Sequence, residues 1–311
     1  MRSRIKQIST AILGGALLGG LFLPACAASA PQPQDSRKTI VVTYSILGAV
    51  VRDLVGSQAD VVVPMPNGQD PHEWEPSAKD IQTIMHADLL VQNGLGLEGG
   101  LEKTLAQAAQ NGVKTFTASD YIQVRKVGAG EGIPGGGSDQ ALGASDPHLW
   151  TDPLTMKLVV AALAARLKTD LGMDVTTRAA DLEGRLDALN AEITAQVETL
   201  PPASRKLVTG HESMGYFAQR YGFKLVGAII PSLTTQADVS AADLGALKKL
   251  IQENQVKAVF IELGTPQAVA NAIGQEAGVR VIPLTTHSLP ADGSYFTFMR
   301  NLTGASVDGL K

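Results

Sequence analysis

Short β-rich runs alternate with longer helical patterns along almost the whole chain, and this alternation limits the possible folds more than any other feature. Strand and helix patterns that alternate in this way are typical of α/β layers. We therefore predict an α/β fold. The expected strands are residues 39–43, 61–65, 89–91, 206–208, 224–230, 258–261 and 280–284.

One amphipathic helix, expected at residues 177–200, bears on the domain organisation. Its apolar residues recur every three or four positions, and a Pro-Pro pair follows its last residue. Its place along the chain suits a spacer between two α/β lobes, residues 38–176 and 201–311. An ordinary surface helix of a single domain is the alternative. The apolar positions are Leu182, Leu186, Leu189, Ile193, Val197 and Leu200.

The start of the chain has the features of an export signal. Basic residues precede an apolar stretch shorter than the ~20 residues that a permanent membrane span needs. The stretch ends in LPAC, which resembles the lipobox of bacterial lipoproteins, where the cysteine is lipidated. We predict a signal peptide at residues 1–25, lipidation of Cys26 and a flexible tether at residues 26–37. An ordinary cleaved signal with an incidental cysteine is the alternative.

Composition limits the remaining possibilities. Cys26 is the only cysteine, so an intramolecular disulfide is impossible and the folded part must rely on its core. The formal net charge is −4, with no basic run beyond the signal, which argues against nucleic acid as a partner. We expect an extracytoplasmic monomer that is held at the membrane by the lipid on Cys26.

Residues 127–145 hold a cluster of glycines without helical or strand periodicity. The segment has neither a GK[ST] ending nor a G-x-G-x-x-G motif between a strand and a helix, as phosphate-binding loops require. We interpret it as a mobile surface loop.

Four of the five histidines share a context that predicts a metal site. His72 and His148 each follow Asp-Pro and precede a tryptophan by two residues, whereas His211 and His287 follow predicted strands. At least three of the four lie just past the carboxyl ends of strands, the sheet edge where α/β proteins bind ligands. His86 lies among apolar residues of a helical stretch, and we interpret it as a packing residue.

Imidazole chemistry indicates zinc. Zinc takes four ligands tetrahedrally at about 2.0–2.1 Å, and the second ring nitrogen of each histidine needs an acceptor. Asp70, Asp146 and Glu262 are candidates for that role. Because imidazole binds metal only when neutral, affinity should fall as the pH drops through ~6.5. A metallo-hydrolase with three ligands, an open position and Glu212 or Glu262 as the base is the rival hypothesis, although the H-E-x-x-H motif is absent.

Several stretches together resemble one family over nearly the whole mature chain: PNGQDPHEWEPSAKDI, DPHLWTDP, LVTGHESMGYFAQRYGF, AVFIE and THSLPADGSYFTFMRN. The chain is similar to the cluster A-I (TroA/ZnuA-like) solute-binding proteins of zinc and manganese ABC transporters. The resemblance implies two α/β lobes joined by one long rigid helix, with the metal bound in the cleft between them. It also implies delivery of the metal to a membrane permease and no enzymatic activity.

The family motifs assign the ligands residue by residue. His72 and His148 match the two N-lobe histidines, and His211 matches the third ligand, which is glutamate in many manganese-type members. Most members carry aspartate where this chain has His287, so the chain departs from the family there. Four imidazoles suit Zn²⁺ better than Mn²⁺ or Fe²⁺, although residues 127–145 lack the histidines of dedicated zinc members. Some members have been labelled adhesins, which would be a side role at most here.

Overall fold

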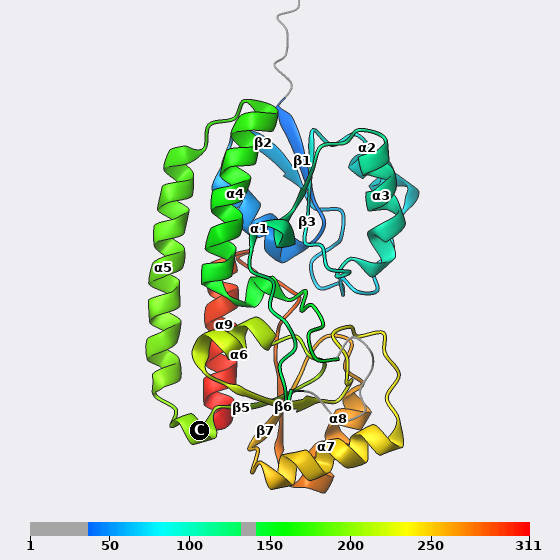
Figure 1. The fold of residues 1–311 in the computed structure, drawn as a ribbon, viewed down its shortest axis with the longest axis vertical. Coiled ribbons are helices and arrows are strands. Elements are labelled where there is room, and N and C mark those ends of the chain that lie inside the picture. Colours follow the sequence, from blue (N-terminus) through cyan, green and yellow to red (C-terminus); the bar gives the residue numbers. More distant parts are fainter. Residues whose placement is uncertain (1–36, 132–140) are drawn as a thin grey trace, which may run out of the picture. The chain divides into compact units, whose positions relative to one another are not determined.

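The computed structural model describes residues 37–131 and 141–311 of the chain (Figure 1). The predicted signal peptide, Cys26 and residues 26–36 of the predicted tether lie outside the described residues. Within the described ranges, we find no helix with the length and apolar character needed to cross a membrane.

Four parallel strands form the first sheet, in the order β2-β1-β3-β4. Alternate residues of its central strands are buried on opposite faces: Ile40 and Val42 belong to the main core, whereas Val41 packs with residues of α2 and α3. The sheet is therefore covered by helices on both faces. The elements are β1 (Lys38–Val42), α1 (Ser45–Val55), β2 (Ala59–Val62), α2 (Ala78–Met85), β3 (Leu89–Gln92), α3 (Glu102–Gln110) and β4 (Thr115–Thr117).

The second half of the chain contributes two parallel pairs of strands, β5-β6 and β7-β8. Strands β5 and β7 lie next to each other, and a second apolar core joins them to α7 and α8. The elements are β5 (Lys206–Thr209), α6 (Gly215–Tyr221), β6 (Lys224–Ala228), α7 (Ala241–Glu253), β7 (Ala258–Ile261), α8 (Gln267–Ala277), β8 (Arg280–Pro283) and α9 (Tyr295–Leu310).

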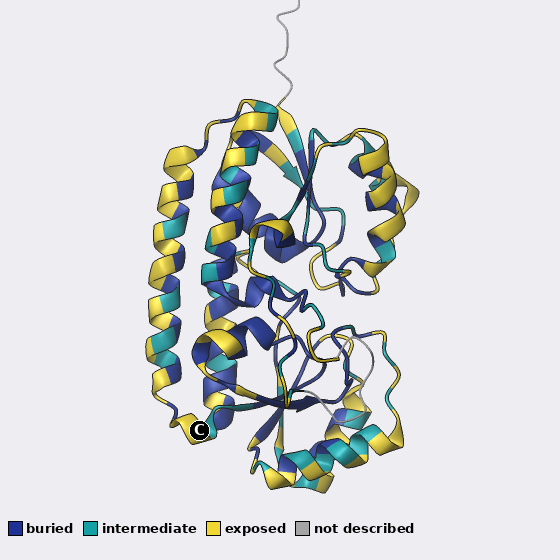
Figure 2. Cartoon of the chain, in the orientation of Figure 1, coloured by how far each residue is buried: buried dark blue, intermediate teal, exposed yellow. Residues whose placement is uncertain are grey.

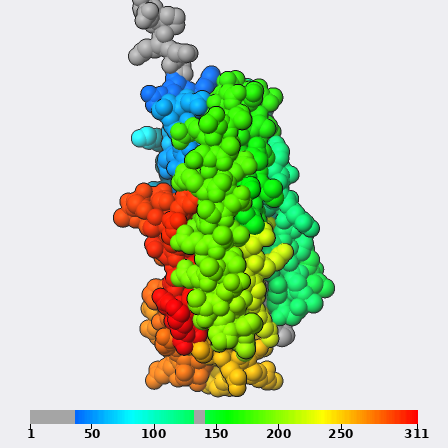
Figure 3. Space-filling view, turned by 90° about the vertical axis from the view of Figure 1, so that its left-hand side faces the viewer, coloured from blue at the N-terminus to red at the C-terminus, as the bar shows by residue number. Residues whose placement is uncertain are grey.

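Helices α4 (Pro153–Leu171) and α5 (Thr176–Glu198) connect the two sets of strands. Helix α5 packs against α4, α1 and α9, and it runs beside α9 along the face seen in Figure 3. One side of α5 is buried and the other is exposed (Figure 2). All six apolar positions expected from the sequence are buried, at most 2% exposed. The helix ends before Pro201 and Pro202, which supply no N–H to continue it.

Most expected strands are present, with three differences. The strand expected at residues 61–65 is wrong in its limits, because the register with β1 starts it at Ala59 and ends it at Val62. Strand β4 was not expected, because its three residues are too few to show a strand pattern. Among the described strands it pairs with β3 alone and forms one edge of the sheet. The strand expected at residues 224–230 ends at Ala228.

The glycine-rich segment is described only at its two ends, since residues 132–140 lie outside the described residues. An isolated antiparallel bridge between Lys126 and Ser145 joins these ends. The carboxylate of Glu131 accepts a hydrogen bond from the backbone N–H of Gly128. The interpretation of this segment as a mobile loop stays a prediction.

Candidate metal centre

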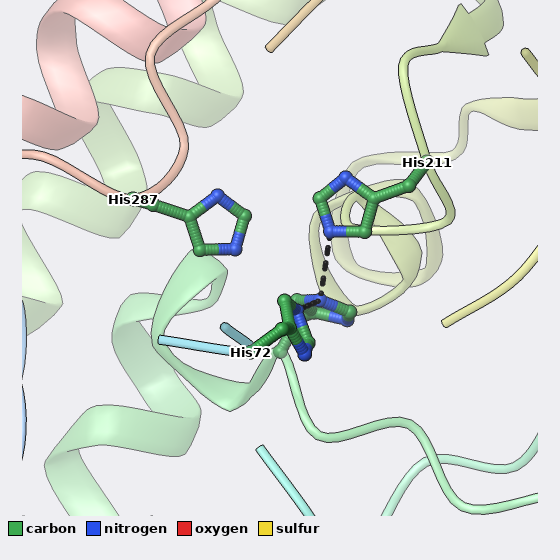
Figure 4. A group of neighbouring side chains, drawn as sticks. His72, His211 and His287 are labelled. Atoms are coloured by element: carbon green, nitrogen blue, oxygen red, sulfur yellow. Dashed lines mark hydrogen bonds between the residues drawn. The ribbon is translucent and has the colours of Figure 1, made fainter. Parts of the chain in front are cut away.

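Four histidines from four separate segments meet in one buried cluster. His72 lies between β2 and α2, His148 precedes a short 3-10 turn (Leu149–Thr151), His211 follows β5 by two residues and His287 follows β8 by four. Each is at most 3% exposed. One ring nitrogen from each lies within 4.8 Å of the others. Figure 4 shows the rings of His211 and His287 pointing toward one another from opposite sides.

The spacing of the ring nitrogens fits a tetrahedral cation. Nε2 of His148 lies 3.3 Å from Nε2 of His72 and 3.2 Å from Nε2 of His211. Four nitrogens at about 2.0–2.1 Å from one zinc ion are about 3.3 Å apart. Among the described residues, the buried Nε2 of His287 has no hydrogen-bond partner. A divalent cation would satisfy that lone pair together with the other three.

Asp146 orients the imidazole of His148. Its Oδ1 lies 2.9 Å from Nδ1 of the ring and also accepts the backbone N–H of His148 at 2.9 Å. The carboxylate assigns the hydrogen to Nδ1, which leaves Nε2 free to face the cluster. The other oxygen of Asp146 accepts from Arg125 at 3.1 Å, and Arg125 is bonded in turn to Glu131 of the glycine-rich segment.

Glu262 plays the corresponding part for His211 directly and for His287 through Thr286. Its Oε2 lies 3.1 Å from Nδ1 of His211, an ion pair rather than a well-aligned hydrogen bond. The same oxygen accepts from the hydroxyls of Ser213 at 2.6 Å and Thr286 at 2.8 Å. Because Thr286 donates to Glu262, its oxygen accepts from Nδ1 of His287 at 2.8 Å, and Nε2 of His287 is again the free atom.

Asp70 has a different place from the one expected. Its Oδ1 accepts the backbone N–H of His72 at 3.0 Å, so it shapes the turn rather than the ring orientation. Within the described part of the chain, its buried Oδ2 has no hydrogen-bond partner. The structure therefore gives Asp146 and Glu262, but not Asp70, a ring nitrogen of the cluster to contact.

The surroundings lower the pKa of three imidazoles of the cluster and raise that of the fourth. Burial, reinforced by the neighbouring histidines, holds the pKa of His72 and of His287 well below the ordinary value. Burial also lowers the pKa of His148, against the opposing effect of Asp146. For His211 burial acts in the same direction, but the Glu262 carboxylate outweighs it and the pKa is raised. The pKa of Glu262 is lowered, as expected for an ion pair.

Two further contacts tie the histidine segments together. Nε1 of Trp150 donates to the backbone oxygen of Thr286 at 2.8 Å, and its ring lies against both His148 and His287. The side-chain amide of Asn67 bonds the backbone of Leu289 in both directions, at 2.8 and 2.9 Å. The repeated tryptophan two residues after a histidine was a visible signal for Trp150, whereas the sequence around Asn67 gave none.

His86 lies outside the cluster, at the end of α2. The interpretation of it as a packing residue is wrong, because the side chain is exposed. Its Nδ1 hydrogen-bonds the backbone oxygen of Gln82 at 2.7 Å, the usual position of a histidine that satisfies the last carbonyls of a helix.

An α/β fold that buries four imidazoles around one point defines a metal-binding protein. The sequence model of the family described as "Zinc-uptake complex component A periplasmic" (ZnuA) matches residues 40–308. The chain belongs to this family, whose members are components of metal uptake systems rather than enzymes. The rival hypothesis of a metallo-hydrolase is therefore wrong.

Similar proteins include binders of two metals. The chain is 31% identical over 278 residues to the zinc-binding lipoprotein AdcA of Streptococcus pneumoniae serotype 4, and the match covers 89% of this chain but 54% of AdcA. The chain thus spans about half the length of that relative. It is 27% identical to the manganese-binding lipoprotein MntA of Bacillus subtilis, over 86% of this chain and 84% of MntA.

A solved structure agrees with the fold. The periplasmic zinc-binding protein TroA of Treponema pallidum superposes with a TM-score of 0.76 at 23% identity, covering 88% of this chain and 99% of TroA. The chain therefore has a TroA-like α/β fold with parallel sheets.

Proposed function

We propose that this protein captures Zn²⁺ outside the cytoplasm and delivers it to the permease of an ABC importer, while a lipid on Cys26 holds it at the membrane. The observation that carries the proposal is the buried cluster of His72, His148, His211 and His287. Membership of a family of zinc-uptake components supports it, as do the two relatives that are named as lipoproteins.

The donor set favours zinc over harder cations. All four candidate ligand atoms are imidazole nitrogens, which suit zinc, whereas manganese prefers carboxylate, carbonyl and water oxygens. The dication would not be left without compensating charge, because the carboxylates of Asp146 and Glu262 contact the outer nitrogens of two ligands. These carboxylates would compensate the charge of the ion through the histidines that they contact, without coordinating the ion themselves.

The same proposal divides the fold into two lobes, residues 38–176 and 201–311, with α5 as the linking helix and the metal bound in the cleft between them. The first sheet lies within residues 38–117 and the other two within residues 206–283. His72 and His148 would come from the first lobe, and His211 and His287 from the second. A continuous helix of 23 residues would favour small movements of the lobes over wide closure.

Manganese is the second candidate cargo, because relatives named as manganese-binding match at an identity close to that of the zinc-binding one. Elemental analysis of protein purified without added metal, followed by competition of Zn²⁺ against Mn²⁺, separates the two. We expect one zinc ion per chain and displacement of manganese by equimolar zinc. A site that retains manganese in the presence of zinc would refute the zinc assignment.

Transport has its own test. We consider a bacterial strain from which the binding protein of the zinc importer has been deleted. When this strain expresses the present chain together with the permease that belongs to it, the strain should grow in zinc-depleted medium. Growth that is equally well restored by a variant lacking all four histidines would contradict the proposed role.

A further inference from the structure

The turn that follows β3, residues 93–100, has an unusual backbone. Gly94, Leu95 and Gly96 follow one another with positive φ angles of 87°, 61° and 74°. Glycine adopts such angles readily, but leucine does so at a cost in energy. A conformation of this kind persists only where the surroundings hold it in place.

Glu98 supplies much of that restraint. Its side chain is 3% exposed, and its carboxylate accepts the backbone N–H groups of Asn93 at 2.6 Å and Gly94 at 3.2 Å. The hydroxyl of Thr43, the residue directly after β1, donates to it at 2.8 Å. Because this buried carboxylate binds both N–H groups of the turn and a hydroxyl beside β1, it fixes the turn to the sheet.

Asn93 extends this restraint to the segment of His148. Its side chain is fully buried, and its Nδ2 donates to the backbone oxygen of Pro147 at 2.8 Å. Its Oδ1 accepts from the hydroxyl of Tyr44 at 2.9 Å, so both ends of the amide are occupied. Pro147 is the residue directly before His148.

The other end of the turn contacts the segment of His72. A Cβ atom at Gly99 would lie 2.8 Å from the backbone oxygen of His72, and one at Gly100 would lie 2.3 Å from that of Trp74. Only residues without a side chain allow the two backbones to approach so closely. The two ends of one turn thus lie against the main chain beside two of the four histidines.

We propose that residues 93–100, held by Glu98, are a positioning unit that sets the distance and orientation of His72 relative to His148 and thereby tunes metal affinity and coordination geometry. Asn93 acts through Pro147 on one histidine, and Gly99 acts through the backbone of His72 on the other. The inference rests on the proposed function, because it assumes that these histidines bind the metal.

Two variants test the two contacts separately. Asn93→Asp keeps the shape and the acceptor for Tyr44 but replaces the donor to Pro147 with an oxygen. Gly99→Ala adds one methyl group against the backbone of His72. We expect each variant to weaken zinc binding by about tenfold, the lower range for residues behind metal ligands, and to change the visible absorption spectrum of the Co²⁺-loaded protein, which reports coordination geometry.

Each variant has a matched control. Asn190 on α5 accepts from the hydroxyl of Tyr221 at 3.2 Å, as Asn93 does from Tyr44, so Asn190→Asp changes a comparable contact away from the cluster. Gly184, also on α5, has open space around it among the described residues, so Gly184→Ala introduces the same methyl group without a clash. Both controls should keep the parent's zinc affinity and Co²⁺ spectrum.

The outcomes are distinguishable. A purely structural role for the turn would lower the melting temperature of the metal-free variants but leave the Co²⁺ spectrum and the zinc affinity of the folded protein unchanged, and that result would overturn the inference. A parent protein that binds neither Zn²⁺ nor Co²⁺ would instead refute the proposed function itself, and the inference with it.

Discussion

The number of protons released when zinc binds depends on how the surroundings shift the pKa of each histidine. Four histidines with an ordinary pKa near 6.5 would together carry about three protons at pH 6, all of which a metal would have to displace. In this protein burial lowers the pKa of His72, His148 and His287, so these rings hold fewer protons at that pH than free histidines would. His211, whose pKa is raised by Glu262 against the effect of burial, keeps its proton.

We therefore expect zinc binding to release clearly fewer than three protons at pH 6, chiefly the one on His211, and almost none well above the raised pKa of His211. One linked proton corresponds to a tenfold loss of affinity, about 1.4 kcal/mol, for each pH unit below that pKa. The decline should begin above pH 6.5, because the titrating group holds its proton more tightly than a free histidine does. This replaces the expectation from sequence, in which all four histidines titrate together near 6.5.

Isothermal titration calorimetry in two buffers with different protonation enthalpies counts the released protons directly. Glu262→Gln removes the charge that raises the pKa of His211, so proton release at pH 6 should decrease in this variant. Asp152→Asn is a suitable control, because Asp152 is a buried carboxylate that pairs with Arg220 instead of a histidine. Release of about three protons by the parent at pH 6 would refute this account of the electrostatics.

Three further changes have defined outcomes. His287→Ala should weaken zinc binding, measured by chelator competition, by more than the factor of about 10 to 100 that is typical when a residue behind a metal ligand is changed. The control His86→Ala should leave the zinc affinity unchanged. Equal zinc affinity of the two variants would exclude His287 as a ligand. Leu186→Ala should lower the free energy of unfolding in urea by about 2–5 kcal/mol, since Leu186 is fully buried on α5. Asn67→Ala removes two hydrogen bonds to Leu289 and should speed zinc release about fivefold in stopped-flow experiments; an unchanged rate would mean that this contact does not restrain the site.

The sequence predicted most of what is periodic or chemically distinctive. Helix α5 was predictable because its six apolar residues repeat at helical spacing, and the four histidines because few residue types bind metal in that context. The limits of β2 were not, since they depend on pairing with β1, which lies more than a dozen residues earlier. Strand β4 was too short to give a pattern.

The supporting residues were harder to predict than the histidines. Asp146 and Glu262 could be proposed as ring acceptors from their proximity in sequence or their position after a strand. Asp70 begins the same Asp-Pro-His sequence as Asp146, yet among the described residues its carboxylate hydrogen-bonds only the backbone N–H of His72. Glu98 accepts from the hydroxyl of Thr43 and Asn93 donates to the backbone oxygen of Pro147, and each partner lies more than about 50 positions away along the chain. A contact between a side chain and a distant carbonyl leaves no recognisable pattern in a single sequence.

The distribution of the four histidines along the chain has a consequence for folding. Because each comes from a different segment, and the last follows β8, no partly folded chain can present the whole set. The free energy of zinc binding is then available only to the completely folded protein, and it adds to the stability of that state alone. A chain truncated before β8 would keep three of the four imidazoles and lose this contribution. Bound zinc would therefore stabilise only the completely folded state. The metal-bound protein should then resist proteolysis along its whole length rather than only near the cluster.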